Sequence, residues 1–184
     1  DTRRIIRATG EATVSARPEI AKFNAGVVTQ AATAQEAANQ NASQVEVMLA
    51  QLRTLLGANA DLRTTSYSLA AVYRSPTPGT TPVLSGYQAS NTVEVTVADL
   101  SLVGKAIDTA TQAGGNNISS LRFTVKDETP LHAQALTQAA RQARSQAEAI
   151  AAGLNVRVGH VLSAGEGGVY AVATDRATGA AAPT

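Results

Sequence analysis

The sequence predicts an α+β protein in which helices pack on one face of a mixed, mainly antiparallel sheet. Three observations predict it. Segments that alternate apolar and polar residues come in adjacent pairs, two long segments have helical periodicity, and strands do not alternate regularly with helices. Adjacent strands favour hairpins, and the irregular order argues against a parallel α/β sheet. The predicted order is β-β-α-β-β-α-β-α-β.

Residues 5–16 and 19–29 have the alternating pattern of two strands. Between them lies Arg17-Pro18, where the proline fixes its own φ and cannot donate to a strand ladder. These residues therefore predict a β-hairpin that turns at Pro18.

A long helix is predicted over residues 34–56. Thr33 and Glu36 have the spacing of a capping box, and Gly57 supplies a stop. Between these signals, apolar residues recur at helical spacing. They are Val45, Met48, Leu49, Leu52, Leu55 and Leu56.

A second, longer hairpin is predicted from strands 62–73 and 86–97, joined by the proline-rich loop 75–86. In the second strand Asn91 falls in phase with the apolar side chains, while the threonines share the opposite, solvated face. We favour a structural role for Asn91, because buried amides usually bond to backbone groups. The alternative is a site residue near the edge of the sheet.

Asp99 predicts the cap of a short helix that ends at Gly114-Gly115, and a strand is predicted over 117–126. Thr129 is the expected N-cap of a long helix that ends at Gly153, with a proline in its first turn. Most of the apolar positions of this helix are alanines, which favours close packing against another element. A last strand is predicted over 156–163.

Residues 1–163 are expected to form one domain, followed by a flexible Gly/Ala-rich segment at 164–184. No apolar run approaches the roughly 18–20 residues that a spanning helix needs, so no transmembrane segment is expected. The chain starts DTRRII without an initiator Met, as a processed product would, and a removed secretory leader is compatible with that start.

Composition excludes several classes of function. The formal charge of +1 argues against a nucleic-acid binder, and the six Phe and Tyr residues offer few stacking platforms. There is no cysteine, which excludes disulfides, thiolate metal sites and a Cys nucleophile. Protection against peroxide would therefore have to be indirect, because a thiol cycle is not available.

No catalytic, cofactor-binding or metal-ligating residue is predicted. His132 and His160 are the only histidines and lack a metal-ligand spacing, and no serine lies in a G-x-S-x-G elbow. The Gly-rich stretch 113–120 follows a helix and precedes a strand, which is typical of a turn and not of a phosphate-binding loop.

Two groups of arginines are interpreted as solvated residues or salt-bridge partners, with an anionic-partner patch as the less favoured alternative. One group, Arg141 and Arg144, lies on the long predicted helix, and the other, Arg3, Arg4 and Arg7, lies at the N-terminus.

Several segments together resemble the SIMPL-domain family, a bacterial family that includes a periplasmic immunogenic protein and relatives linked to oxidative-stress defence. They are ATGEATVSARPEIA (8–21), GYQASNTVEVTV (86–97), AGGNNISSLRFTV (113–125) and ARSQAEAIAAGLNVRVGHVLS (143–163). The resemblance implies a secreted or periplasmic α+β protein, sometimes associated with the outer membrane, that tends to self-assemble. It implies no catalytic residues. Such proteins commonly continue with a further alternating strand after the Gly/Ala-rich segment, and a missing strand would leave an edge for another subunit to cover.

The favoured hypothesis is thus a non-enzymatic periplasmic envelope protein that acts through homo-oligomeric assembly, with no cofactor. The alternative is a periplasmic binding module for a small ligand or an envelope partner, suggested by loop 75–86 and the N-terminal arginines. A hydrolytic enzyme is the least favoured class, because no nucleophile and base are recognisable together.

Overall fold

The structure is a computed structural model that describes residues 5–58, 60–75 and 81–167. These residues form two compact units: one is Glu19–Thr124, and the other comprises the described residues before and after it. The predicted α+β class is confirmed. The elements are β1 (Ile20–Ala31), α1 (Ala34–Leu56), β2 (Leu62–Arg74), β3 (Val83–Val97), a 3-10 turn (Leu100–Leu102), α2 (Val103–Gln112), β4 (Asn117–Thr124) and α3 (Thr129–Gly153).

The sheet of the first unit is antiparallel throughout, with strand order β2-β3-β1-β4. The hairpin predicted from 5–16 and 19–29 is wrong, because β1 has β3 on one edge and β4 on the other. With both edges of β1 occupied, residues 5–16 have no free edge of that strand to pair with, and they form no strand. The second predicted hairpin is confirmed as β2 and β3.

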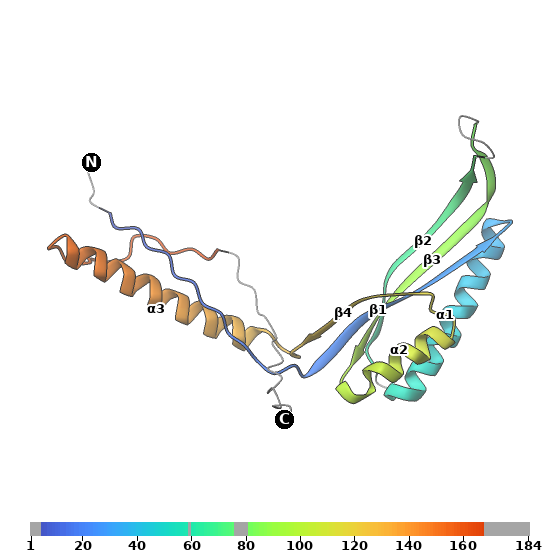
Figure 1. Cartoon of the computed structure of the whole chain (residues 1–184), viewed down its shortest axis with the longest axis horizontal. Coiled ribbons are helices and arrows are strands. Elements are labelled where there is room, and N and C mark those ends of the chain that lie inside the picture. The colour runs from blue at the N-terminus through green and yellow to red at the C-terminus, as the bar shows by residue number, and fades with distance from the viewer. Residues whose placement is uncertain (1–4, 59, 76–80, 168–184) are drawn as a thin grey trace, which may run out of the picture. The chain divides into compact units, whose positions relative to one another are not determined.

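Helices α1 and α2 cover one face of this sheet (Figure 1). The core lies between them and the sheet, and its largest fully buried apolar side chains include Phe23 of β1 and Met48 and Leu52 of α1. Helix α1 has the bounds that the sequence predicts. The Thr33 hydroxyl accepts a hydrogen bond from the Glu36 amide at 3.2 Å, and Gly57 follows the last turn.

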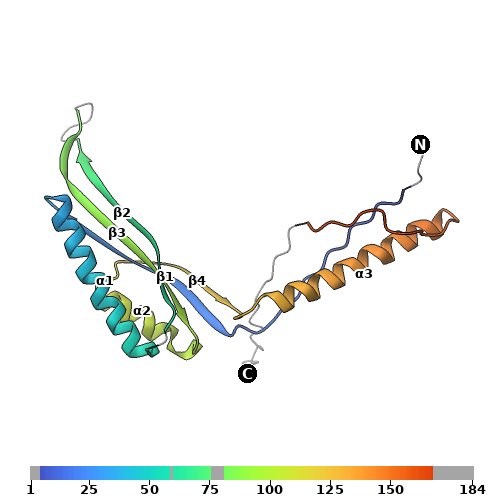
Figure 2. The same cartoon turned by 180° about the vertical axis from the view of Figure 1, so that it is seen from behind.

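The second unit is built around α3, and an extended segment, residues 5–18, lies along this helix (Figures 1 and 2). Exposed residues alternate along the segment with residues that are less exposed, and Val14 is buried. At Gly10 the contact is so close that an added Cβ would collide with the carbonyl oxygen of Ala139. The small side chains of α3 therefore do permit a close approach, here of an extended segment.

The strand predicted over 156–163 is also wrong, because these residues pair with no strand and form none. The Val156 amide instead bonds to the carbonyl of Ala151 at 2.9 Å, beyond the end of α3. The chain then returns along the helix (Figures 1 and 2), and Glu166 reaches His132 in its first turn at 2.8 Å. The Gly/Ala-rich segment lies mostly outside the described residues.

Asp99 caps the 3-10 turn as predicted, since its carboxylate accepts the Ser101 amide at 3.0 Å. The cap of α3 differs from the prediction. Thr129 is its first helical residue, and the carboxylate of Asp127 accepts the Thr129 amide at 2.9 Å. Two hydrogen bonds lower the pKa of Asp127: the larger effect comes from the Thr129 side chain and the smaller from the Thr129 backbone amide.

We expect this cap to make the start of α3 sensitive to acid. Because the pKa of Asp127 is lowered on folding, the cap contributes fully above the ordinary aspartate pKa of about 3.9 and is lost as the pH falls through the lowered value. Hydrogen exchange of the first turn of α3 should be measured between pH 5 and pH 2.5, and each rate divided by the intrinsic exchange rate at the same pH. In the wild type this ratio should rise as the pH falls. An Asp127→Ala variant that retained the same rise would contradict this assignment.

Candidate functional site

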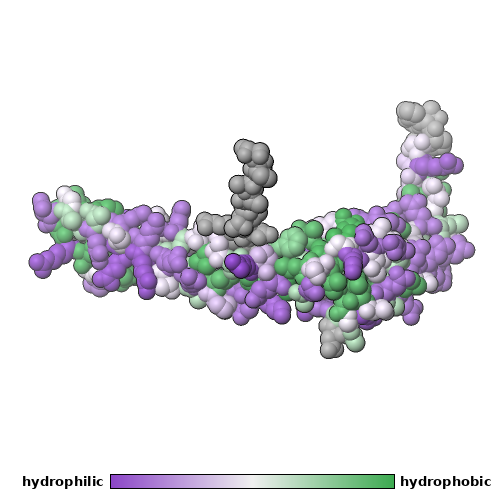
Figure 3. Space-filling view, turned by 60° about the horizontal axis from the view of Figure 1, so that its bottom comes forward, coloured by the Kyte–Doolittle hydropathy of each residue, from purple (hydrophilic) through white to green (hydrophobic). Residues whose placement is uncertain are grey.

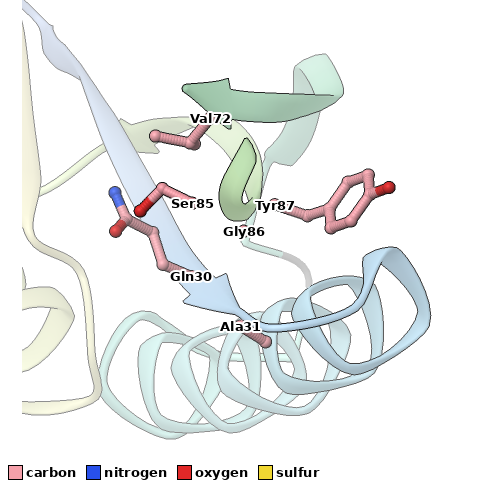
Figure 4. Close-up of a pocket in the computed structure, with 6 residues that line it drawn as sticks. All are labelled: Gln30, Ala31, Val72, Ser85, Gly86 and Tyr87. Carbon is pink, nitrogen blue, oxygen red and sulfur yellow. The ribbon is translucent and has the colours of Figure 1, made fainter. Parts of the chain in front are cut away.

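A shallow pocket of about 230 Å³ lies where the β2–β3 hairpin extends past the end of β1. Figure 4 shows the Gln30 amide and the Ser85 hydroxyl turned to one side together with Val72, while the Tyr87 ring points away. The remaining lining comes from Ala31 and Gly86. The pocket lies beside the predicted loop 75–86, of which residues 76–80 are outside the described residues. Residues 83–86 of that predicted loop belong to β3.

Gly86 fixes the geometry of this pocket. Its φ of 150° is one that residues with a side chain rarely adopt, and an added Cβ would lie 2.7 Å from the Ala31 carbonyl oxygen. Next to it, Ser85 is an extra residue in β3, because Val72 pairs with Gly86 while Tyr73 pairs with Leu84. Such a bulge bends a strand and re-aims a side chain, in this case the Ser85 hydroxyl.

Replacing Gly86 by valine should destabilise the protein by about 1–3 kcal/mol, because the Cβ collides with backbone that cannot move aside. Urea unfolding followed by circular dichroism measures this change. The control is Gly104→Ala in α2, where an added Cβ meets nothing within 4 Å and should be neutral or stabilising. Equal effects of the two substitutions would show that Gly86 is not needed for the bulge.

Asn91 lies on the face of the sheet that bears the helices, as its phase predicts, between the buried residues Ala89 and Val93. The expected bonds from a buried amide to the backbone are made by a different residue, Asn41 of α1. Its side chain is completely buried, and its Nδ2 donates to the carbonyls of Val27 at 2.8 Å and Ala89 at 3.2 Å. Asn41 therefore ties α1 to both central strands.

Two buried carboxamide oxygens, Asn41 Oδ1 and Asn91 Oδ1, have no hydrogen-bond partner among the described residues. Asn91 stands opposite Val27, whose carbonyl accepts from Asn41, so both carboxamides lie at the same rung of the sheet. Each oxygen can accept a hydrogen bond from a small donor such as water. Asn41 is not among the residues predicted from the sequence, although it lies four residues before Val45 on the apolar face of the helix.

The opposite face of the sheet is polar and carries the threonines of β3, as predicted. On it the Glu94 carboxylate pairs with Lys22 at 3.4 Å and with Arg122 at 2.8 Å, which links β3, β1 and β4. The side chain of Glu94 is 19 % exposed, so its charge is partly shielded from water and balanced by two cations. This arrangement fits a structural ion pair across three strands.

The other residues considered from the sequence do not come together. His132 pairs with Glu166, and His160 is exposed on an irregular segment. Arg144 pairs with Glu148 at 2.9 Å along α3, as the salt-bridge interpretation expects. Arg141 is exposed on the same helix. In the N-terminal group Arg7 is exposed, and Arg3 and Arg4 lie outside the described residues.

In the Gly-rich stretch 113–120, residues 113–116 form the turn between α2 and β4, as predicted, and residues 117–120 belong to β4. Its Asn116 side chain extends the sheet, because the oxygen accepts the Val28 amide at 3.0 Å and the nitrogen donates to the Val28 carbonyl at 2.8 Å. Within the described ranges, no group of three or more His, Asp or Glu side chains is placed to hold a metal ion. Every helix of that part of the chain falls short of the combined length and hydropathy that crossing a membrane requires.

An antiparallel four-stranded sheet with two helices on one face, joined to a helix with extended flanking segments, defines an α+β protein. The chain belongs to the SIMPL family, whose model is described as "Protein of unknown function (DUF541)" and matches residues 6–184.

Three curated proteins are similar to this chain. The 26 kDa periplasmic immunogenic protein of Brucella melitensis biotype 1 is 27% identical over 164 residues, which cover 88% of this chain and 66% of that protein. The protein of the same name from Brucella abortus (strain S19) has the same identity and coverage. An uncharacterized protein YggE of Edwardsiella ictaluri is 38% identical over 80 residues, 44% of this chain and 34% of that protein. The chain thus spans 66% of the length of the Brucella relatives.

Proposed function

We propose that this chain is a non-enzymatic, secreted SIMPL protein of the periplasm that acts through homo-oligomeric assembly. The observation that carries the proposal is the outermost strand β2, which leaves Tyr67, Leu69 and Tyr73 exposed by 52%, 42% and 61%. A long uncovered edge strand with exposed apolar side chains is a template for another chain. In the view of Figure 3, further apolar residues reach the surface at separate places on both units.

The periplasmic location rests on the names of the Brucella relatives. A role in envelope or oxidative-stress defence and an association with the outer membrane rest on the family resemblance alone. In this proposal residues 1–163 form the SIMPL-like domain, and the Gly/Ala-rich residues 164–184 follow it. Fractionation of cells that express the full-length gene would place the protein, and its recovery only with cytoplasmic markers would refute the proposed location.

Light scattering of the purified chain across a hundredfold range of concentration tests the assembly. We expect a discrete multimer whose population grows with concentration. A chain that stayed monomeric over the whole range, measured also for the full-length gene product, would refute homo-oligomeric function. Enzymatic activity is tested separately, and turnover in a hydrolase screen that survived repurification would refute the non-enzymatic assignment.

A binding module for a small ligand or an envelope partner is the second candidate, and the pocket beside Gly86 favours it. Its volume of about 230 Å³ is below the range of roughly 300–1,000 Å³ typical of drug-sized ligands, so a small polar ligand suits it best. The Ser85 hydroxyl and the side-chain oxygen of Gln30 would supply hydrogen bonds, whereas the Gln30 side-chain nitrogen already donates to Gln88 at 2.8 Å. Thermal stability measured across a panel of small polar compounds tests this candidate, since a ligand that binds only the native state raises the melting temperature. An unchanged melting temperature throughout would argue against it.

A further inference from the structure

The two outer strands of the sheet differ in how well their edges are protected. β2 has an extra residue, Thr65, near its start, and from Ser66 to Arg74 it continues without another. The second irregularity of this pair puts the extra residue in β3 and leaves β2 regular. Residues 66–73 include no charge, proline or glycine, the features that usually protect an edge.

β4, at the other edge, is interrupted. Its register against β1 shifts between the pairs Lys22–Arg122 and Asn24–Ser119. Ser120, inside this interruption, has a positive φ of 58°. The regular stretches on either side are three residues each, 117–119 and 122–124, at the lower end of strand lengths in globular proteins, so β4 offers no long regular template. The sheet therefore has one protected and one unprotected edge.

We infer that β2 pairs antiparallel with β2 of a second copy of this chain, across a twofold axis within residues 66–73. This inference rests on the proposed homo-oligomeric function and names its contact surface. The choice of a second β2 as the partner follows from the sheet. In the described part of the chain β2 is the outer strand with a long regular edge, whereas β4 is interrupted. Pairing of identical edges also closes the assembly, whereas β2 against β4 would repeat without end.

Charge and side-chain facing are compatible with this pairing. Neither strand brings a charge into the stretch 66–73, so two copies meet without repulsion there. Tyr67 and Leu69 stand opposite Asn91 and Ala89 of β3, which places both on the helix-bearing face. In an antiparallel pair they would meet the same face of the second copy, where aromatic and aliphatic cross-strand contacts stabilise sheets.

The contact is small, and this determines how it must be measured. A stretch of eight residues is roughly 27 Å long at about 3.4 Å per residue. One strand per copy buries less than the roughly 1,600 Å² of a standard interface, so we expect a dimer with a dissociation constant in about the micromolar range. Light scattering should therefore show a concentration-dependent step from monomer to dimer.

The absence of cysteine allows a direct test, because a single introduced thiol can react only with its copy in another chain. Leu69→Cys and Leu121→Cys form a matched pair: both leucines lie on outer strands, and they are 42% and 47% exposed. With a thiol crosslinker long enough to tolerate a register shift of two residues, Leu69→Cys should give a covalent dimer at micromolar protein. Leu121→Cys should not. Equal crosslinking of the two variants, or none at Leu69→Cys, would overturn the inference.

A second variant pair measures the affinity. Leu69→Lys puts a charge near the twofold axis in both copies and should raise the dissociation constant by about tenfold or more. Leu121→Lys should leave it unchanged. A dimer unaffected by Leu69→Lys in a folded protein would overturn the β2 contact while leaving assembly intact. A wild type that is monomeric at every concentration would refute the proposed homo-oligomeric function as well. If an extended peptide of a partner protein then protected β2 from hydrogen exchange, the strand that pairs with β2 would belong to a different protein.

Discussion

Replacing Asn41 by alanine should lower the free energy of unfolding by about 2–3 kcal/mol. The side chain is completely buried, and its amide holds the carbonyls of Val27 and Ala89. Truncation removes two hydrogen bonds between α1 and the central strands and leaves a cavity between helix and sheet. Urea unfolding of the full chain, followed by circular dichroism, measures the loss.

Asn39 provides the matched control. It lies on the same helix, but its side chain is exposed and accepts a hydrogen bond from the Gln35 side chain, one turn earlier. Asn39→Ala should change stability by less than about 0.5 kcal/mol, since exposed substitutions of this kind have small effects. If the two alanine variants were equally stable, Asn41 would not be the tie between α1 and the sheet.

Asn41→Leu separates the two parts of this effect. Leucine fills much of the space but makes no hydrogen bond, and it leaves the unpartnered oxygen of Asn91 in place. If the hydrogen bonds dominate, the leucine variant should remain destabilised by about 1–2 kcal/mol. A leucine variant more stable than the wild type would show that desolvation of the buried amide outweighs its bonds, as occurs for some buried polar groups.

Much of the first unit could be predicted from local patterns. The capping box at Thr33 and the stop at Gly57 bound α1 as expected, and the alternation in β3 assigns its buried face. Apolar periodicity alone does not detect Asn41, because its side chain is polar. A polar residue on the buried face of a helix breaks that pattern, and the break is the signal of a buried hydrogen bond.

The errors at the two ends of the chain arise because alternation of apolar and polar residues does not by itself show strand pairing. Residues 5–16 are extended and buried on one side, whereas residues 156–163 are exposed throughout. Whether such a segment becomes a strand depends on a free neighbouring edge, which is a property of the whole sheet. Residues 5–18 pack against α3. They cannot pair with β1, because β3 and β4 already occupy both of its edges. Sequence periodicity contains neither fact.

The contact between segment 5–18 and α3 should be lost when Gly10 is replaced by valine. An added side chain would collide with the backbone of Ala139 and Ala143, and backbone within a helix cannot shift without breaking helical bonds. Overpacking of this kind costs about 1–3 kcal/mol. In this part of the protein few side chains are buried, so we expect the segment to detach before the helix distorts.

Trypsin measures that detachment at Arg7, which lies three residues before Gly10 on the exposed side of the segment and is followed by Ala8. Cleavage after Arg7 requires the bound segment to open, and its rate in Gly10→Val should rise about tenfold or more, in proportion to the open population. Thr9→Val is the control, since it places the same valine one residue earlier, at an exposed position, and adds no bulk toward the helix. A Gly10→Val variant cleaved at the rate of Thr9→Val would mean that the close approach at Ala139 does not hold the segment. A selective increase would establish that the alanines of α3 act as the docking surface for the extended N-terminal segment.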